Sequence, residues 1–134
     1  MIRTMTRPKI NITLPKIFDV KWGDVIYVNF GDNVGSEQCG IRPALVVQND
    51  KGNSHSSCTL VAPITSEEKS PLPTHILVYP TRASGLKETS TVMCEQIRVI
   101  DKSRIISKVG HLDAERLVKK IEYCISIAFS KDIA

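Results

Sequence analysis

Five short, valine-rich apolar runs dominate the sequence between Asp24 and Ile100, and turn-rich connections separate them. The runs read DVIYVNF (24–30), PALVVQ (43–48), TLVAPIT (59–65), THILVYP (74–80) and TVMCEQIRVI (91–100). Runs of this length that are rich in β-branched residues are typical of strands. Consecutive strands that are joined by loops, with no helices between them, imply an antiparallel sheet. The sequence therefore predicts a mainly β (α+β) fold in which the sheet curls into a small barrel.

The C-terminal segment has the clearest helical pattern in the chain. Apolar residues recur along it at helical spacing: Leu117, Ile121, Cys124 or Ile125, and Ala128. Asp113 precedes this pattern and is its predicted N-cap. We expect the apolar stripe to pack on the sheet, although a groove for a partner helix would require the same pattern. A short helical turn is also predicted over residues 102–105, with Asp101 as its cap.

The excess of basic over acidic residues lies entirely within the first 21 residues of the chain. At 134 residues the chain has the length of one domain. Its net charge of +4 equals the excess of five basic residues over Asp19 within residues 1–21, so the remainder is neutral. Bulk charge therefore indicates no partner for the main domain. Residues 1–21 are predicted to be a basic extension, most simply a tail, and residues 22–134 the folded domain. A basic arm that helps to hold a ligand of the domain, and a start at Met5, are the alternatives.

The four cysteines are spread along the chain without any C-x-x-C pair, which is not the spacing of a zinc site. We therefore predict free thiols, no metal and no cofactor. Cys94 and Cys124 fall within apolar patterns, where cysteine behaves as a small hydrophobe. Free thiols favour a reducing compartment, and no apolar run approaches the roughly 18 residues of a membrane-spanning helix. The expected location is the cytoplasm.

Arg42 and Thr65 mark the start of one predicted strand and the end of the next. Pro43 restricts Arg42 to extended conformations. If the two strands pair as a hairpin, a fixed guanidinium and a hydroxyl meet at one end of the sheet, which suits a phosphodiester. The alternative is a surface ion pair of Arg42 with Glu37 and a solvated strand end, and chemistry alone favours this second interpretation.

The stretch GSEQCGIRPALVVQND (35–50), together with GDVIYVNF, APIT, LPTHILV and EQIRVIDKSRI, resembles the MazF/PemK family of toxin endoribonucleases. The resemblance runs from about Trp22 to Phe129 and is nearest to the MazF branch of Gram-positive bacteria. It implies an SH3-like or CcdB-like barrel with a C-terminal helix, assembled as a homodimer. It also implies metal-independent, sequence-specific cleavage of single-stranded mRNA to 2′,3′-cyclic phosphate and 5′-hydroxyl ends, which blocks translation. A MazE-like antitoxin is the expected protein partner.

The resemblance assigns the site residue by residue. It implies that Arg42 and Thr65 are catalytic. Glu37 is our candidate for the general base, and orienting Arg42 or holding the loop are equal alternatives for it. The expected RNA-binding residues are Ser36, Gln38, Pro43, Ser66, Lys69, Glu95 and Gln96. Among these, Gln96 is expected on a strand, where its amide would read a base edge, and a glutamine with no role on the sheet surface is the equal alternative. His75 and His111 are expected to be structural, and Ile41 excludes the histidine that some relatives carry before the arginine.

A second function class stays open at this point. The same fold carries toxins that poison gyrase and binding proteins without nuclease activity. A non-catalytic CcdB-like toxin or binding protein is therefore the alternative. The pair of Arg42 and Thr65 favours the nuclease, because a non-catalytic relative has no evident need for both.

Overall fold

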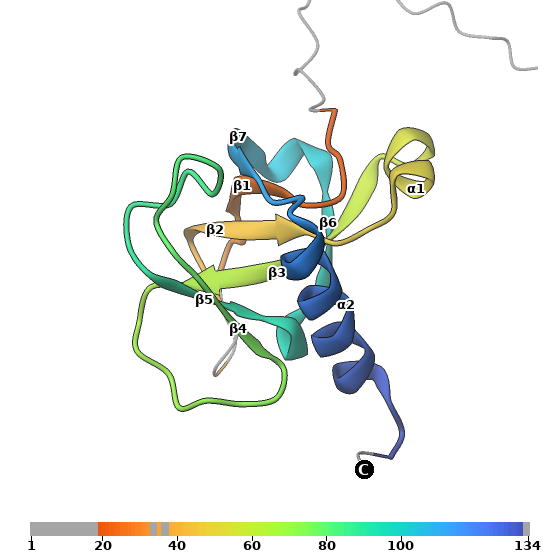
Figure 1. Cartoon of the computed structure of the whole chain (residues 1–134). Helices are drawn as coiled ribbons and strands as arrows, with labels where there is room; N and C mark the ends of the chain where they lie inside the picture. The colour runs from red at the N-terminus through yellow and green to blue at the C-terminus, as the bar shows by residue number, and fades with distance from the viewer. Residues whose placement is uncertain (1–18, 33–34, 36–37, 133–134) are drawn as a thin grey trace, which may run out of the picture.

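The computed structural model describes residues 19–32, 35 and 38–132, which form a seven-stranded antiparallel sheet with a C-terminal helix (Figure 1). The strands are β1 (Asp24–Asn29), β2 (Ile41–Val46), β3 (Cys58–Thr65), β4 (His75–Val78), β5 (Ser90–Met93), β6 (Arg98–Asp101) and β7 (Ile105–His111). The helices are α1 (Asp50–His55) and α2 (Glu115–Phe129), with 3-10 turns η1 (Cys94–Gln96) and η2 (Lys102–Arg104). The mainly β fold with a C-terminal helix is confirmed.

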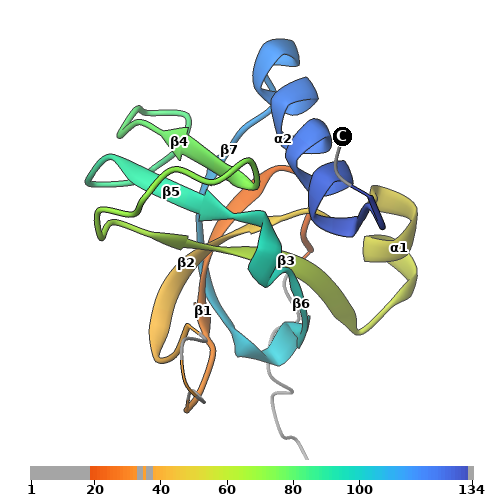
Figure 2. The same ribbon diagram turned by 90° about the horizontal axis from the view of Figure 1, so that it is seen from below.

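The sheet is not a closed barrel. Its strands follow the order β4-β5-β3-β2-β1-β7, and β6 pairs with β3 beside this path. Figure 2 shows β4 and β5 on one side of β3, and β1 and β2 on the other. Over the described part of the chain, β4 and β7 end the path without pairing with each other, so the small barrel that the sequence predicts is an open one.

The longest apolar run, residues 91–100, is two strands and not one. β5 pairs with β3 through Ile64 and Thr65, whereas β6 pairs with β3 through Cys58–Val61. The chain must therefore turn to pass from one half of β3 to the other, and η1 makes this turn. Gln96 lies on η1, so its predicted position on a strand is wrong.

The connection between β2 and β3 contains α1, which the turn-rich sequence did not indicate. Asn49 caps this helix, since its side chain accepts a hydrogen bond from Gly52 N at 2.8 Å. The helix has only six residues and includes a glycine, so its sequence resembles that of a turn.

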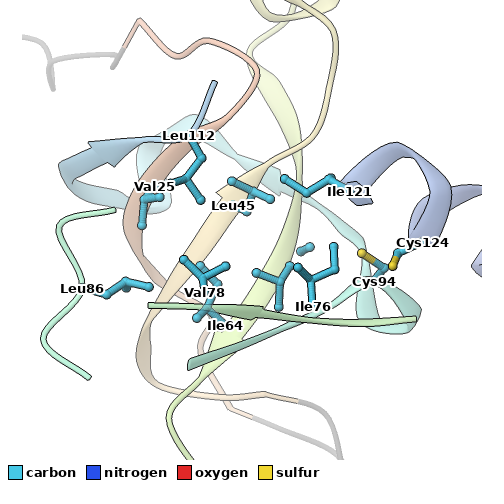
Figure 3. Close-up of a cluster of buried hydrophobic side chains, with 12 residues drawn as sticks. Val25, Leu45, Ile64, Ile76, Val78, Leu86, Cys94, Leu112, Ile121 and Cys124 are labelled. Carbon is cyan, nitrogen blue, oxygen red and sulfur yellow. The ribbon is translucent and has the colours of Figure 1, made fainter. Parts of the chain in front are cut away.

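The central strands β1 and β3 and the second half of β2 are buried on both faces, which explains why they are continuous apolar runs. Along β2, Leu45 belongs to one core cluster, while its neighbours Ala44 and Val46 belong to the other, as the two-residue period of a strand requires. The first cluster lies beneath α2 (Figure 3) and consists of Val25, Leu45, Ala62, Ile64, Ile76, Val78, Leu86, Val92, Cys94, Leu112, Ile121 and Cys124. The second consists of Val20, Ile26, Val28, Phe30, Ala44, Val46, Val61, Ile100 and Ile105.

The α2 helix packs its predicted stripe on the sheet. Ile121 and Cys124 are buried in the first cluster, and Leu117 packs against it, which confirms the predicted packing. The prediction of Asp113 as N-cap is wrong, because the N-cap is Ala114, whose side chain makes no capping hydrogen bond. Leu112 N donates a hydrogen bond to Gly23 O at 2.8 Å. Because backbone pairing with the segment before β1 continues to Leu112, the helix begins only after Asp113. No helix in the described ranges has the length and apolar character needed to cross a bilayer.

The two buried cysteines behave as the sequence predicts. Cys94 and Cys124 both lie in the first cluster (Figure 3). Burial raises the pKa of the Cys94 thiol to about 12, with smaller contributions from Cys124 and Glu95. Burial also raises the pKa of Cys124. All four cysteines are free thiols.

The predicted basic extension lies mostly outside the described residues. Val20 is 1% exposed and belongs to the second core cluster. Lys21 N donates to the Asp24 carboxylate at 2.8 Å. The interpretation of residues 1–18 as a tail stays a prediction.

Candidate functional site

The register of β2 and β3 brings Arg42 and Thr65 to the same end of the sheet. The pairs recorded between these strands end at Ala44 opposite Pro63. Two residues further along each strand, on the same face, lie Arg42 and Thr65. The pairing of the two strands, which is the condition under which the sequence predicts that these two residues meet, is therefore present.

Both residues line a hollow of about 470 Å³ at this end, the strand-end hollow. Its lining residues are Tyr27, Arg42, Pro43, Ile64, Thr65, Ser66, Leu86, Lys87, Glu88 and Ser90. Thr65 is 2% exposed, and its hydroxyl oxygen accepts a hydrogen bond from Glu67 N at 3.1 Å. The described residues offer no acceptor for the hydroxyl hydrogen, so this hydrogen is available to a bound anion.

The Arg42 guanidinium is hydrogen-bonded through Nε, whereas its two terminal nitrogens have no partner among the described residues. Its Nε donates to the Cys39 carbonyl at 3.2 Å. Two backbone bonds close the hairpin just before it, from Phe30 N to Gly40 O and from Gly40 N to Gly31 O. Within residues 19–32, 35 and 38–132, neither terminal nitrogen of the guanidinium has a partner. Arg42 therefore presents free, charged donors at the site.

A second hollow of about 550 Å³, the turn hollow, lies over η1 and β6. Its lining residues are Gln38, Pro63, Glu95, Gln96, Ile97, Arg98 and Val99. It thus gathers three of the predicted RNA-binding residues, Gln38, Glu95 and Gln96. Among the residues that the structure describes, the Gln96 amide makes one weak contact, from Nε2 to Met93 Sδ at 3.7 Å, and the rest of its bonding capacity is unused.

The Glu95 carboxylate is held by two residues that lie outside η1, Thr74 and His75. Its Oε1 accepts from Thr74 Oγ1 at 2.9 Å, and its Oε2 lies 2.8 Å from His75 Nε2. Burial alone would raise the pKa of Glu95, but the hydrogen bonds from His75, its own backbone and Thr74 together lower that pKa below its usual value. Glu95 is consequently an ionised acceptor near neutral pH.

The structure divides the predicted residues among three hollows. Arg42, Pro43, Thr65 and Ser66 line the strand-end hollow, and Gln38, Glu95 and Gln96 line the turn hollow. Lys69 lies apart from both, in a third hollow that also contains His75 and Lys120, and it forms an exposed ion pair with Glu67 at 3.5 Å. Ser36 and Glu37 lie outside the described residues. In the part of the chain that is described, His, Cys, Asp and Glu side chains form no group of three or more suited to a metal ion.

Several lining residues were not singled out from the sequence. Tyr27, Lys87 and Glu88 line the strand-end hollow, and Arg98 of the turn hollow stacks over Phe30 at 5.3 Å. Lys87 follows Gly85, which has a φ of +66° and where any side chain would collide with the Val109 carbonyl. That glycine is the one local signal of a tightly packed loop, and it does not reveal which strand the loop approaches.

Residues 21–129 match the sequence model of the PemK-like, MazF-like toxin of type II toxin-antitoxin system. The chain belongs to this family. Endoribonuclease EndoA of Bacillus subtilis (strain 168) is 43% identical over 112 residues, which are 83% of this chain and 95% of EndoA. Endoribonuclease MazF of Staphylococcus saprophyticus is 36% identical over 107 residues, which are 79% of this chain and 88% of that protein. The resemblance to the MazF/PemK family, and to its Gram-positive members, is confirmed.

Solved structures show the same fold at low sequence identity. MazF (Form-I) from Deinococcus radiodurans has a TM-score of 0.67 at 22% identity and covers 81% of this chain and 94% of its own. A mycobacterial endoribonuclease in complex with its cognate antitoxin has a TM-score of 0.66 at 19% identity, over 86% of this chain and 99% of its own. The open sheet with its C-terminal helix is therefore the MazF architecture.

Proposed function

We propose that this chain is the toxin of a toxin–antitoxin pair and that it cleaves single-stranded RNA. The observation that carries the proposal is the position of Arg42 opposite Thr65 in one hollow, in a member of the PemK/MazF family. Both residues line this hollow, and among the described residues the terminal guanidinium nitrogens and the hydroxyl hydrogen have no partner. The named relatives EndoA and MazF are endoribonucleases, and they match most of this chain.

The proposed reaction uses the 2′-hydroxyl of the RNA as nucleophile. The 2′-oxygen forms a bond to phosphorus while the bond from phosphorus to the 5′-oxygen breaks. The products are a 2′,3′-cyclic phosphate and a 5′-hydroxyl end. Negative charge builds up on the non-bridging oxygens, where the Arg42 fork and the Thr65 hydroxyl donate hydrogen bonds that are strongest in the transition state.

Two protons must move in this reaction. The 2′-hydroxyl loses one proton, and the departing 5′-oxygen gains one. A guanidinium is a poor base because it keeps its charge in proteins, but the N–H groups of Arg42 can donate toward the leaving oxygen. Glu37 is our candidate for the base, and it precedes Gln38, which lines the turn hollow. The reaction as written requires no metal and no cofactor from the protein.

The remaining predicted residues serve RNA binding in this proposal. Gln38, Glu95 and Gln96 provide amide and carboxylate groups to bases that are splayed out of a single strand. Pro43 and Ser66 flank the reacting phosphate, and Ser36 precedes the proposed base. Lys69 lies in a separate hollow, so any phosphate it contacts is further along the strand.

A MazE-like antitoxin is the proposed protein partner, and a homodimer in the cytoplasm the proposed assembly and location. A mycobacterial endoribonuclease of this fold was solved with its cognate antitoxin, and a MazE–MazF structure from Deinococcus radiodurans also matches. Sedimentation of the purified chain, alone and with its antitoxin, tests both assemblies.

The decisive test is digestion of a long, unstructured RNA in EDTA, with mapping of the fragment ends. We expect cuts at one short motif that leave cyclic phosphates, and none with Arg42→Ala. Arg82→Ala removes an exposed loop arginine and is the matched control, with unchanged cleavage expected. Intact RNA from a folded wild-type protein, tested on several RNAs, would reject the nuclease and favour the non-catalytic CcdB-like alternative.

A further inference from the structure

His75 lines the third hollow, the His75 hollow, and its Nε2 contacts Glu95, which lines the turn hollow. The His75 hollow has a volume of about 260 Å³ and is lined by Lys69, Pro71, Leu72, His75, Leu77, Thr91 and Lys120. We propose that His75 is a positioning residue: together with Thr74 it fixes the Glu95 carboxylate as an acceptor in the turn hollow, and thereby sets which RNA sequence is cut. This inference rests on the proposed endoribonuclease function.

Three hydrogen bonds connect residues 74–75 to η1, twenty residues away in sequence. Cys94 N donates to Thr74 O at 3.0 Å, Thr74 Oγ1 donates to Glu95 Oε1 at 2.9 Å, and His75 Nε2 lies 2.8 Å from Glu95 Oε2. One backbone bond therefore holds the turn, and two side-chain bonds hold the orientation of its carboxylate. We call these residues the Glu95 clamp: Thr74, His75, Cys94 and Glu95.

The burial of His75 indicates a role beyond packing. Its side chain is only 10% exposed, and among the described residues its Nδ1 has no hydrogen-bond partner. Leaving a buried polar atom unpaired is unfavourable, and an apolar side chain at this position would avoid it. What the imidazole supplies in return is the bond from Nε2–H to Glu95, made by the tautomer that carries its hydrogen on Nε2. The ring is thus suited to orienting Glu95 rather than to filling space.

The clamp leaves Glu95 able to bind. A carboxylate has about four acceptor positions, and the clamp uses one on each oxygen. The Glu95 side chain is 34% exposed and lines the turn hollow. Because its orientation is set before RNA arrives, little further ordering is needed on binding. A fixed, ionised acceptor favours a base that presents an N–H group and disfavours one that presents an acceptor at the same place.

The clamp does not touch the reacting groups. Arg42 and Thr65 line the strand-end hollow, and none of the four clamp residues lines it. Loss of the His75 bond should therefore weaken the binding and discrimination of RNA, and leave the chemical step on saturating RNA nearly unchanged. This separates a positioning role from general destabilisation, which would lower the amount of active protein for every RNA alike.

The test compares His75→Leu with His75→Gln, because the glutamine amide nitrogen can take the place of Nε2 as donor to Glu95. Each variant is assayed on a short RNA with the mapped motif and on RNAs with single-base changes. For His75→Leu we expect KM to rise by about tenfold, the preference for the correct motif to fall by about tenfold, and kcat to stay within about twofold. His75→Gln should retain both values. His55→Gln, at an exposed histidine on α1, is the control and should match wild type.

The other outcomes of this test each support or overturn the proposed role of His75. Unchanged KM and motif preference in folded His75→Leu would overturn the proposal, as would a loss confined to kcat. Should His75→Leu fail to fold, Thr74→Val removes the other side-chain bond and must shift KM and preference in the same direction. Binding of the same RNAs by fluorescence anisotropy tests the clamp independently of cleavage. If wild type leaves RNA intact, the proposed nuclease function is rejected, and the binding assay still tests the clamp. Loss of selective RNA binding in His75→Leu would support the clamp, and unchanged selective binding would overturn it.

Discussion

The strand-end hollow and the turn hollow hold their polar groups in opposite ways. Backbone pairing of β2 with β3 places Arg42 and Thr65, and the donor groups at their tips have no partner among the described residues. Side chains from another part of the chain place Glu95, and both of its carboxylate oxygens are engaged before any ligand binds. In the strand-end hollow the backbone positions are fixed, while the donor groups have no partner among the described residues. In the turn hollow the carboxylate group of Glu95 is itself held in place, on a short turn.

This difference matches what each task requires. Stabilising a transition state needs donors that make their strongest bonds only when charge builds up on the phosphate. Discriminating among bases needs an acceptor whose direction is set in advance. The two hollows therefore predict that reaction rate and sequence preference can be altered separately, and the following experiments test that separation.

The largest effect is expected at Arg42. Arg42→Ala removes the free guanidinium from the strand-end hollow, and we expect kcat to fall by about 10³-fold, because charged donors at a developing oxyanion contribute on this scale. Arg42→Lys keeps the charge but loses the fork, so an intermediate rate is expected. Single-turnover cleavage measures both. The motif preference of the residual activity should be that of wild type, and a changed preference would break the separation.

Thr65 should show a smaller effect of the same kind. Thr65→Val keeps the shape but removes the hydroxyl, and we expect kcat to fall by about 10–100-fold with KM nearly constant. Glu67 N also loses its acceptor, so the free energy of unfolding should fall by about 1 kcal/mol. Thr65→Ser restores the hydroxyl and should recover most of the rate. Steady-state kinetics and urea unfolding distinguish the two contributions.

The pH dependence of stability should reveal the Glu95 clamp. The pKa of Glu95 is lower in the folded protein than its usual value of 4.5, so the unfolded state binds the proton more readily. The clamp's contribution is therefore complete above about pH 4.5 and lost as the pH falls through the folded pKa. In urea unfolding, the stability difference between wild type and Glu95→Gln should shrink from about pH 7 to about pH 3. A constant difference would argue against the ionised clamp.

The smallest effect concerns the reactivity of the thiols, which reports whether η1 opens locally and exposes Cys94. Because the pKa of Cys94 is raised to about 12 by burial, its reactive thiolate is scarce, and Cys124 is shifted in the same direction. The half-buried Cys39 and Cys58 should react with a thiol reagent much faster at about pH 8. Mass spectrometry of digests locates the labels. Equal labelling of Cys94 and Cys39 would mean that η1 opens easily and does not preset Glu95.

The sequence alone determined those features that depend on local rules. Apolar runs of strand length, the stripe on α2 and the Asp101 cap of η2 follow from periodicity and capping between near neighbours, and the structure has all three. The meeting of Arg42 and Thr65 also followed, because the two strands are consecutive and a hairpin fixes their register. The motif around Arg42 was sufficient to identify the family.

Tertiary structure decided what depends on residues that are far apart. The break of residues 91–100 into β5, η1 and β6 arises because β3 pairs with different strands along its two halves. The clamp of His75 and Thr74 on Glu95 spans about twenty residues, and the approach of Lys87 to Arg42 depends on how a loop packs. No local propensity encodes these contacts, because their free energy comes from side chains that meet only after the strands have paired. The groups proposed for the chemistry could thus be read from neighbouring strands, whereas the arrangement proposed for recognition existed only in the folded chain.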